Sequence, residues 1–135
     1  VIIANNVPLG GHVHIEDSVV IGGNSAVQQF TRIGRLAMIG GMTGVLKDVI
    51  PFGLSIGNRN YLQGLNLIGL RRKNYENKKI MELDKAYKEI FSFKKLHENL
   101  SKININFKSN ELVKEVINFI SKDKKRAICT PLNQE

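Results

Sequence analysis

The chain has 135 residues, about the size of one domain, which is enough to bury a hydrophobic core. An apolar fraction of 42% and a charged fraction of 24% are typical of a folded protein, and no apolar run approaches the length of a membrane span. The single cysteine, Cys129, excludes an internal disulfide and predicts a reducing, cytoplasmic compartment.

Charge and glycine content both divide the chain near residue 60. Residues 1–60 hold only four of the 20 cations but ten of the 12 glycines, and residues 61–135 carry a net charge of +7. We therefore expect two domains, 1–60 and 61–135, of different construction. Because Val1 falls within a repeat and is not a methionine, we also expect this chain to be part of a longer protein.

A period of six dominates residues 1–60. A large aliphatic residue recurs at every sixth position, at Ile3, Leu9, Ile15, Ile21, Val27, Ile33, Ile39 and Val45. Two residues before each lies a β-branched or small residue, and residues two apart on an extended chain face the same side. Each hexad therefore directs one large and one small group inward, which predicts a β-solenoid.

Four glycines come directly after an aliphatic residue of this series, and we interpret them as corner residues that need a free choice of φ. They are Gly10, Gly22, Gly34 and Gly40. A looser continuation of the repeat is expected at 51–57. A solenoid exposes an apolar cross-section at its end, so a capping element is also expected.

From about Leu62 the apolar spacing becomes helical. A short helical turn is expected at 66–73, and apolar stripes at 80–91, 96–103 and 112–120 predict three longer helices. We expect a break at 104–108 and an N-cap at Ser109 or Asn110 before the last helix. Residues 61–135 thus predict an α-helical cap domain.

Several segments resemble bacterial hexapeptide acyltransferases: LGGHV at 9–13, IGGMTGV at 39–45 and DVIPF at 48–52. Two further segments narrow the resemblance to the UDP-N-acetylglucosamine O-acyltransferases, namely GNRN at 57–60 and GLNLIGLRR at 64–72. The resemblance covers the whole chain, both the repeat and the helical region.

This resemblance implies a left-handed parallel β-helix with three hexads per coil, assembled as a homotrimer with active sites between neighbouring subunits. It implies transfer of a 3-hydroxyacyl group from acyl carrier protein to the 3-hydroxyl of UDP-N-acetylglucosamine in lipid A biosynthesis, with no cofactor and no metal. The family's general base is a histidine that would lie upstream of Val1, so we expect this chain to be inactive alone.

The resemblance assigns three residues to the repeat's side of the site. The Gly11 N–H would donate to the oxyanion, although Gly11 could instead be a corner glycine only. His12 would lie near the sugar, and Gln29 would contact the nucleotide sugar. The alternative for Gln29, together with Gln28 and Phe30, is an outward bulge that fills the trimer interface.

Four further residues are assigned in the same way. Asn66, Arg72 and Lys73 would hold UDP or the phosphopantetheine arm, and cations suit a diphosphate. The alternative is a basic helix start that is merely solvated. Gly41 would line the acyl groove and limit chain length, unless it too is only a corner glycine.

The sequence departs from the family pattern at four positions. Gln28 stands where histidine is common and cannot carry a proton, and Arg59 replaces a position often occupied by histidine or another residue. Ile68 stands where some relatives have glutamate, which removes a polar contact to the nucleoside. Lys73 stands where many have arginine, which removes a bidentate contact.

Three other functions remain open from the residues. The first is the N-acyltransferase of the same pathway. The second is a metal-dependent lyase, for which His12 and His14 could bind zinc, although the only other histidine is the distant His97. The third is a non-catalytic interaction module. The scattered lysines without stacking aromatics argue against nucleic acid. They suit either an acidic carrier protein or a Lys- and Asn-rich surface that is merely solvated.

Overall fold

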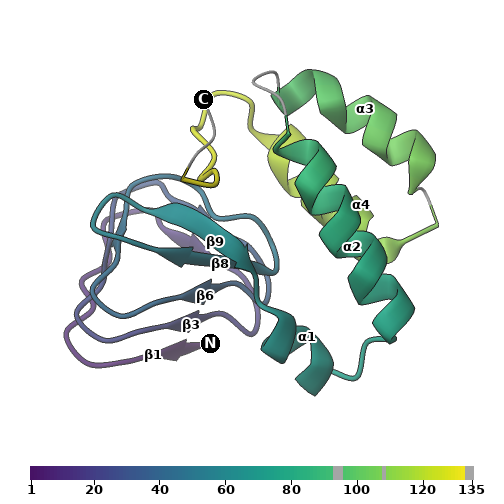
Figure 1. The fold of residues 1–135 in the computed structure, drawn as a ribbon. Coiled ribbons are helices and arrows are strands. Elements are labelled where there is room, and N and C mark those ends of the chain that lie inside the picture. Colours follow the sequence, from purple (N-terminus) through teal and green to yellow (C-terminus); the bar gives the residue numbers. More distant parts are fainter. Residues whose placement is uncertain (93–95, 108, 133–135) are drawn as a thin grey trace.

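The computed structural model describes residues 1–92, 96–107 and 109–132. The first part of the chain consists of short strands stacked in layers (Figure 1). They are β1 (Ile2–Ile3), β2 (His14–Ile15), β3 (Val20–Ile21), β4 (Ala26–Val27), β5 (Arg32–Ile33), β6 (Met38–Ile39), β7 (Gly44–Val45), β8 (Gly53–Ile56) and β9 (Tyr61–Leu65).

The strands pair in parallel with a constant offset, and this offset defines the coil. Ile2 pairs with Val20 and Val20 with Met38, so each residue lies over the residue 18 positions further on. The β2–β5 and β4–β7 pairs keep the same offset and form the other two sides of the stack. One coil is therefore three hexads, and the prediction of a β-solenoid is confirmed.

The last coil is shorter than the others. Met38 pairs with Leu54, an offset of 16 residues, and Ile33 likewise bridges to Val49. This is the looser continuation expected from the sequence at 51–57. Strand β9 then turns back and pairs antiparallel with β8, which ends the parallel stacking.

The hexad pattern describes the interior of the stack correctly. The large aliphatic series is fully buried from Ile21 onward except for a trace of exposure at Val27, and the small series is buried from Val19 to Thr43. The inward hydroxyls are satisfied, because Ser25 Oγ and Thr43 Oγ1 both donate to the Gly40 carbonyl, over 2.9 and 2.6 Å. Ser25 and Thr43 therefore carry no unpaired donor into the core.

The interpretation of the four glycines needs correction. Positive φ occurs instead three residues after each aliphatic residue, at Asn6, His12, Ser18, Asn24, Phe30, Leu36 and Met42. A Cβ on Gly10 would collide with the backbone of Gln29, and one on Gly34 with Pro51. These glycines are needed because consecutive coils approach closely, not because the backbone turns there.

Four helices follow the strands in the described part of the chain: α1 (Leu67–Arg72), α2 (Asn77–Ile90), α3 (Leu96–Asn106) and α4 (Glu111–Lys122). Helix α4 begins at the expected N-cap Asn110, whose Oδ1 accepts from the Leu112 and Val113 N–H groups. Helix α3 continues into the break expected at 104–108, and Lys108 lies outside the described residues. In the described part, no helix is long and apolar enough to cross a membrane.

The three longer helices lie beside the coils and do not cover their end (Figure 1). The end of the stack is closed by the chain after α4, because Ile128 bridges to Asp48 and the Leu62 N–H donates to the Thr130 carbonyl over 2.9 Å. Ile128 and Cys129 are buried there. The structure thus differs from the expected helical cap, because an extended segment can pair with the open strand edge and a helix cannot.

Candidate functional site

The sequence-predicted site residues occur at three corners of the coil stack. We call these the His12 corner (Gly11, His12, Gln29 and Phe30), the Leu36 corner (Arg35, Leu36, Pro51 and Phe52) and the Gly41 corner (Gly23, Asn24, Gly41 and Met42). Each corner contains residues with positive φ from successive coils. Consecutive layers of the His12 and Gly41 corners are joined by backbone hydrogen bonds of 2.9 Å.

At the His12 corner, two aromatic rings stack across consecutive coils. The rings of His12 and Phe30 are nearly parallel, 5° apart, with 5.0 Å between their centroids. The Phe30 side chain remains 53% exposed, and His12 and Gln29 are exposed as well. The corner therefore presents an imidazole, an amide and an aromatic face to the outside of the stack.

The Gly11 N–H is available for an external acceptor. Within the described residues it makes no hydrogen bond, whereas the Gly11 carbonyl accepts from the Phe30 N–H over 2.9 Å. The equivalent N–H groups of Gly23, Gln29 and Gly41 are free in the same way. A free N–H is thus a property of the corners, and any special role of Gly11 must come from its neighbour His12.

Asn66 connects the coils to the helices at the Leu36 corner. Its backbone N–H donates to the Phe52 carbonyl over 2.7 Å, and its Nδ2 donates to the Leu36 carbonyl over 2.9 Å. Its Oδ1 accepts from the Gly69 N–H over 3.1 Å and so caps α1. An N-cap of this kind contributes about 1 kcal/mol to helix stability.

The cations predicted to hold substrate lie at the other end of α1. Arg72 is in the last turn and Lys73 is the C-cap, and both side chains are exposed. Cations are favoured there by the helix dipole. Ile68 on the same helix is 64% exposed, so the departure from glutamate leaves an apolar side chain on this surface.

Gly41 is exposed at the Gly41 corner and stacks on Gly23. A Cβ placed on Gly41 would meet only the Gly23 carbonyl oxygen, at 3.4 Å. A side chain at this position would therefore extend outward from the coils and occupy the adjoining surface.

The single chain does not bring all of these residues together. Gly11, His12 and Gln29 share one corner, Asn66 and the α1 cations lie at another, and Gly41 lies at the third. His14 is exposed on the side next to the His12 corner. In the described part of the chain, no three His, Cys, Asp or Glu side chains are grouped so that they could hold a metal ion.

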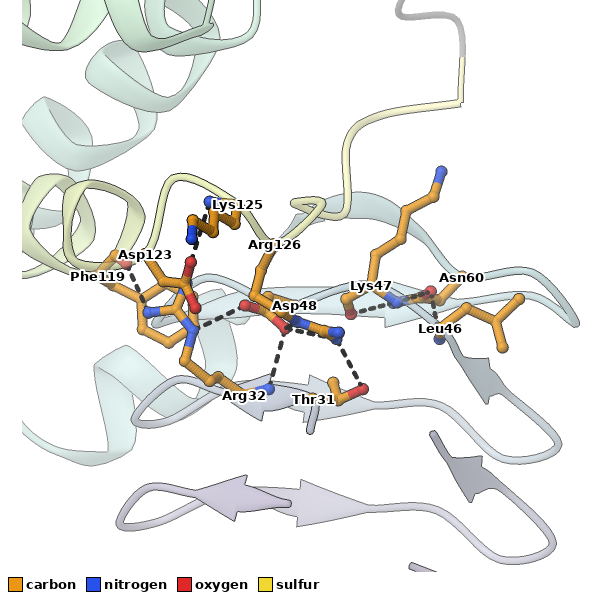
Figure 2. Close-up of polar contacts among 10 residues, drawn as sticks. All are labelled: Thr31, Arg32, Leu46, Lys47, Asp48, Asn60, Phe119, Asp123, Lys125 and Arg126. Carbon is orange, nitrogen blue, oxygen red and sulfur yellow. Dashed lines mark hydrogen bonds and ion pairs between the residues drawn. The ribbon is translucent and has the colours of Figure 1, made fainter. Parts of the chain in front are cut away.

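The sequence analysis missed a buried ionic cluster between the coils and the C-terminal segment (Figure 2). Asp48 is fully buried, and its carboxylate accepts from Arg32 Nε over 2.7 Å and from Arg126 Nε over 3.2 Å. The Arg32 guanidinium also lies over the Phe119 ring, 4.2 Å from its centroid. No periodic signal marks these residues, because they are 16 and 78 positions from Asp48.

A second missed cluster is centred on Arg35 at the Leu36 corner. The Glu115 carboxylate accepts two hydrogen bonds from the Arg35 guanidinium, over 2.9 and 3.1 Å. The same guanidinium donates to the Tyr75 hydroxyl over 2.8 Å and lies over the Phe52 ring. The hydrogen bond with Glu115 raises the pKa of Arg35, and this cluster fixes α4 and the end of α1 against the coils.

Comparison with known proteins shows which family has sequences similar to this chain. A family model described as UDP N-acetylglucosamine O-acyltransferase, domain 2, matches residues 48–129. The acyl-[acyl-carrier-protein]–UDP-N-acetylglucosamine O-acyltransferase of Sinorhizobium fredii is 39% identical over 132 residues, which is 97% of this chain and 49% of the relative. The enzyme of the same name from Nautilia profundicola is 44% identical over 93% of this chain and 51% of its own length.

A solved structure shows the same similarity. The UDP-N-acetylglucosamine acyltransferase of Campylobacter jejuni superposes with a TM-score of 0.87 at 37% identity, covering 95% of this chain and 50% of that chain. This chain therefore spans about half the length of the relatives it matches. Since the similarity covers both the coils and the helices, the chain belongs to the UDP-N-acetylglucosamine O-acyltransferase family.

Proposed function

We propose that the full-length protein containing this chain transfers a 3-hydroxyacyl group from acyl carrier protein to the 3-hydroxyl of UDP-N-acetylglucosamine, in lipid A biosynthesis. The observation that carries the proposal is the identity of about 40% to enzymes of that name over nearly the whole chain. The departures at Gln28, Arg59, Ile68 and Lys73 leave the proposed contacts of Gly11, His12, Asn66 and Arg72 in place.

In this reaction the sugar oxygen attacks the acyl carbonyl, and the bond to the carrier's sulfur breaks. A histidine upstream of Val1 takes the hydroxyl proton and then gives it to the departing thiolate. The free Gly11 N–H donates to the oxyanion that forms between these steps. His12 and Gln29 contact the sugar nucleotide, and the exposed Gly41 corner leaves room for the acyl chain.

We further propose that the site is assembled between neighbouring chains of a trimer whose coils wind in the left-handed sense. The support is the distribution of the residues: His12 lies at one corner of the coils, and Arg72 lies on α1, which is joined to a different corner through Asn66. Residues 1–60 and residues 61–135 would form the two domains of each chain. The basic surface of residues 61–135 would attract an acidic carrier protein.

The test is an acyl-transfer assay with the full-length gene product and defined 3-hydroxyacyl carrier proteins. We expect transfer to UDP-N-acetylglucosamine, and a rise of about tenfold or more in a KM for Arg72→Ala, since a charge-assisted contact is lost. Lys88→Met, which removes an exposed cation paired with Asp84 within α2, is the control. Transfer only to an acylated amino sugar would assign the N-acyltransferase instead, and no transfer at all would leave an interaction module.

A further inference from the structure

Helix α1 is too short to hold its own shape. It has six residues, and isolated helices of fewer than about 12 residues are unstable in water. Its orientation must therefore come from contacts with the rest of the fold, which include the fully buried Leu70 in its middle and contacts at its two ends. Both ends are tied to the same place, the Leu36 corner, although they are joined to it by different residues.

The first end is held by Asn66, through the Phe52 and Leu36 carbonyls. The second end is held by Arg35, through a hydrogen bond to Tyr75. After Lys73 the chain turns through Asn74, which has a positive φ of 62°, and this turn brings the Tyr75 hydroxyl within 2.8 Å of the Arg35 guanidinium. Tyr75 is half-buried, and its backbone N–H donates to Leu70 of α1.

Arg35 itself is fixed more firmly than a surface arginine. Its guanidinium makes the two-pronged contact with Glu115 of α4 and lies 5.2 Å from the centroid of the buried Phe52 ring. Arg35 is also the residue next to Leu36, which accepts the Asn66 bond at the other end of α1. Both ends of α1 are thus connected by hydrogen bonds to Arg35 and Leu36, two adjacent residues of one coil.

We propose that Arg35 is a positioning residue that acts through Tyr75 to fix the direction in which α1 presents Arg72 and Lys73. This inference rests on the proposed function, because it concerns how these two cations meet substrate. Arg35 and Tyr75 do not touch substrate. They restrict the end of a six-residue helix, so that the backbone entropy of fixing the segment that carries its two exposed cations is already lost before binding.

The experiment compares KM and kcat for Tyr75→Phe and Arg35→Lys in the full-length protein. Tyr75→Phe removes one oxygen and keeps the ring, and Lys88→Met, which removes an exposed cation paired with Asp84 within α2, is the control for a lost contact elsewhere on the helices. We expect Tyr75→Phe to raise about fivefold the same KM that Arg72→Ala raises, with kcat within about twofold, as for the loss of one hydrogen bond. Arg35→Lys should behave likewise, because lysine lacks the planar fork.

The decisive measurement is a double-mutant cycle. In an Arg72→Ala, Lys73→Ala background, Tyr75→Phe should have no further effect on KM, because there is no cation left to position. A general loss of folding would instead add in both backgrounds. An additive effect, or an unchanged KM for Tyr75→Phe, overturns the positioning role. The double variant Arg72→Ala, Lys73→Ala could instead leave the KM for both substrates unchanged. That result would refute the proposed substrate contact of these two cations and not the role of Tyr75.

Discussion

The Asp48 carboxylate joins two arginines that are 94 positions apart in the chain, Arg32 on a coil and Arg126 beyond the last helix. Asp48 is fully buried, and the Arg32 N–H also donates to it over 3.0 Å. The C-terminal segment continues directly from this cluster, where the Cys129 N–H donates to the Asp48 carbonyl. The cluster therefore determines how the chain after α4 returns to close the end of the stack.

Asp48→Asn should destabilise the protein strongly. The amide leaves two buried or half-buried guanidinium groups without their counter-charge, and breaking a buried ion pair from one side costs about 3–5 kcal/mol. Urea unfolding measures the loss, and Lys79→Met, which breaks an exposed pair, should cost about 1 kcal/mol or less. A cost for Asp48→Asn no greater than that of the control would contradict this role.

Gly34→Ala should also reduce stability, by about 1–3 kcal/mol, because the new methyl group meets the backbone of Pro51 in the next coil. Gly23→Ala is the matched control. It belongs to the same repeat, but its Cβ would be 3.6 Å from the nearest atom, an ordinary contact. We expect that variant to be neutral or slightly stabilised, since alanine reduces the freedom of the unfolded chain. Equal losses in both variants would refute the close-approach explanation.

Alkaline conditions should weaken the fold through Cys129 and Tyr87. Burial raises the pKa of the Cys129 thiol to about 11, from 9.0, and that of Tyr87 to about 12, from 10.0. The folded state therefore keeps protons that the unfolded chain releases, and stability falls as pH rises from 9 towards 12. Urea unfolding between pH 8 and 11 should give a shallower decline for Cys129→Ala, and an identical decline would show that the thiol does not contribute.

Gly41→Leu should shift the acyl preference towards shorter chains. The side chain would extend outward from the Gly41 corner, where its Cβ meets only the Gly23 carbonyl oxygen at 3.4 Å, so the coils should remain intact. The measurement is competition between 3-hydroxyacyl carrier proteins of two lengths in the full-length enzyme. An unchanged ratio with an unchanged melting temperature would remove Gly41 from the acyl groove.

The parts of this fold that repeat could be predicted from the sequence, and the parts that join distant segments could not. The hexads identify the buried series from Val19 to Val45, and Asn110 is readable as an N-cap because capping depends on neighbouring residues. The role of the glycines was misread because their constraint comes from the next coil, 16 to 19 residues away.

The clusters around Asp48 and Arg35 gave no such signal. Glu115 is 80 positions from Arg35, and nothing local in either segment marks the pair. The site residues were found only through resemblance to a family, since His12, Gln29 and Arg72 are exposed polar residues without a chemical pattern of their own. Their distribution over different corners depends on the three-dimensional arrangement of the coils and could not be predicted from these residues alone.

The separation of His12 and Arg72 over different parts of the chain predicts intersubunit complementation. A chain damaged at the His12 corner still has an intact α1, and a chain with Arg72→Ala still has an intact His12 corner. If each site draws one corner from each of two neighbouring copies, chains carrying His12→Ala and chains carrying Arg72→Ala, each impaired when assembled alone, should regain activity when assembled together. Random mixing into trimers would restore about one quarter of the sites. A protein whose copies each carried a complete site would recover nothing.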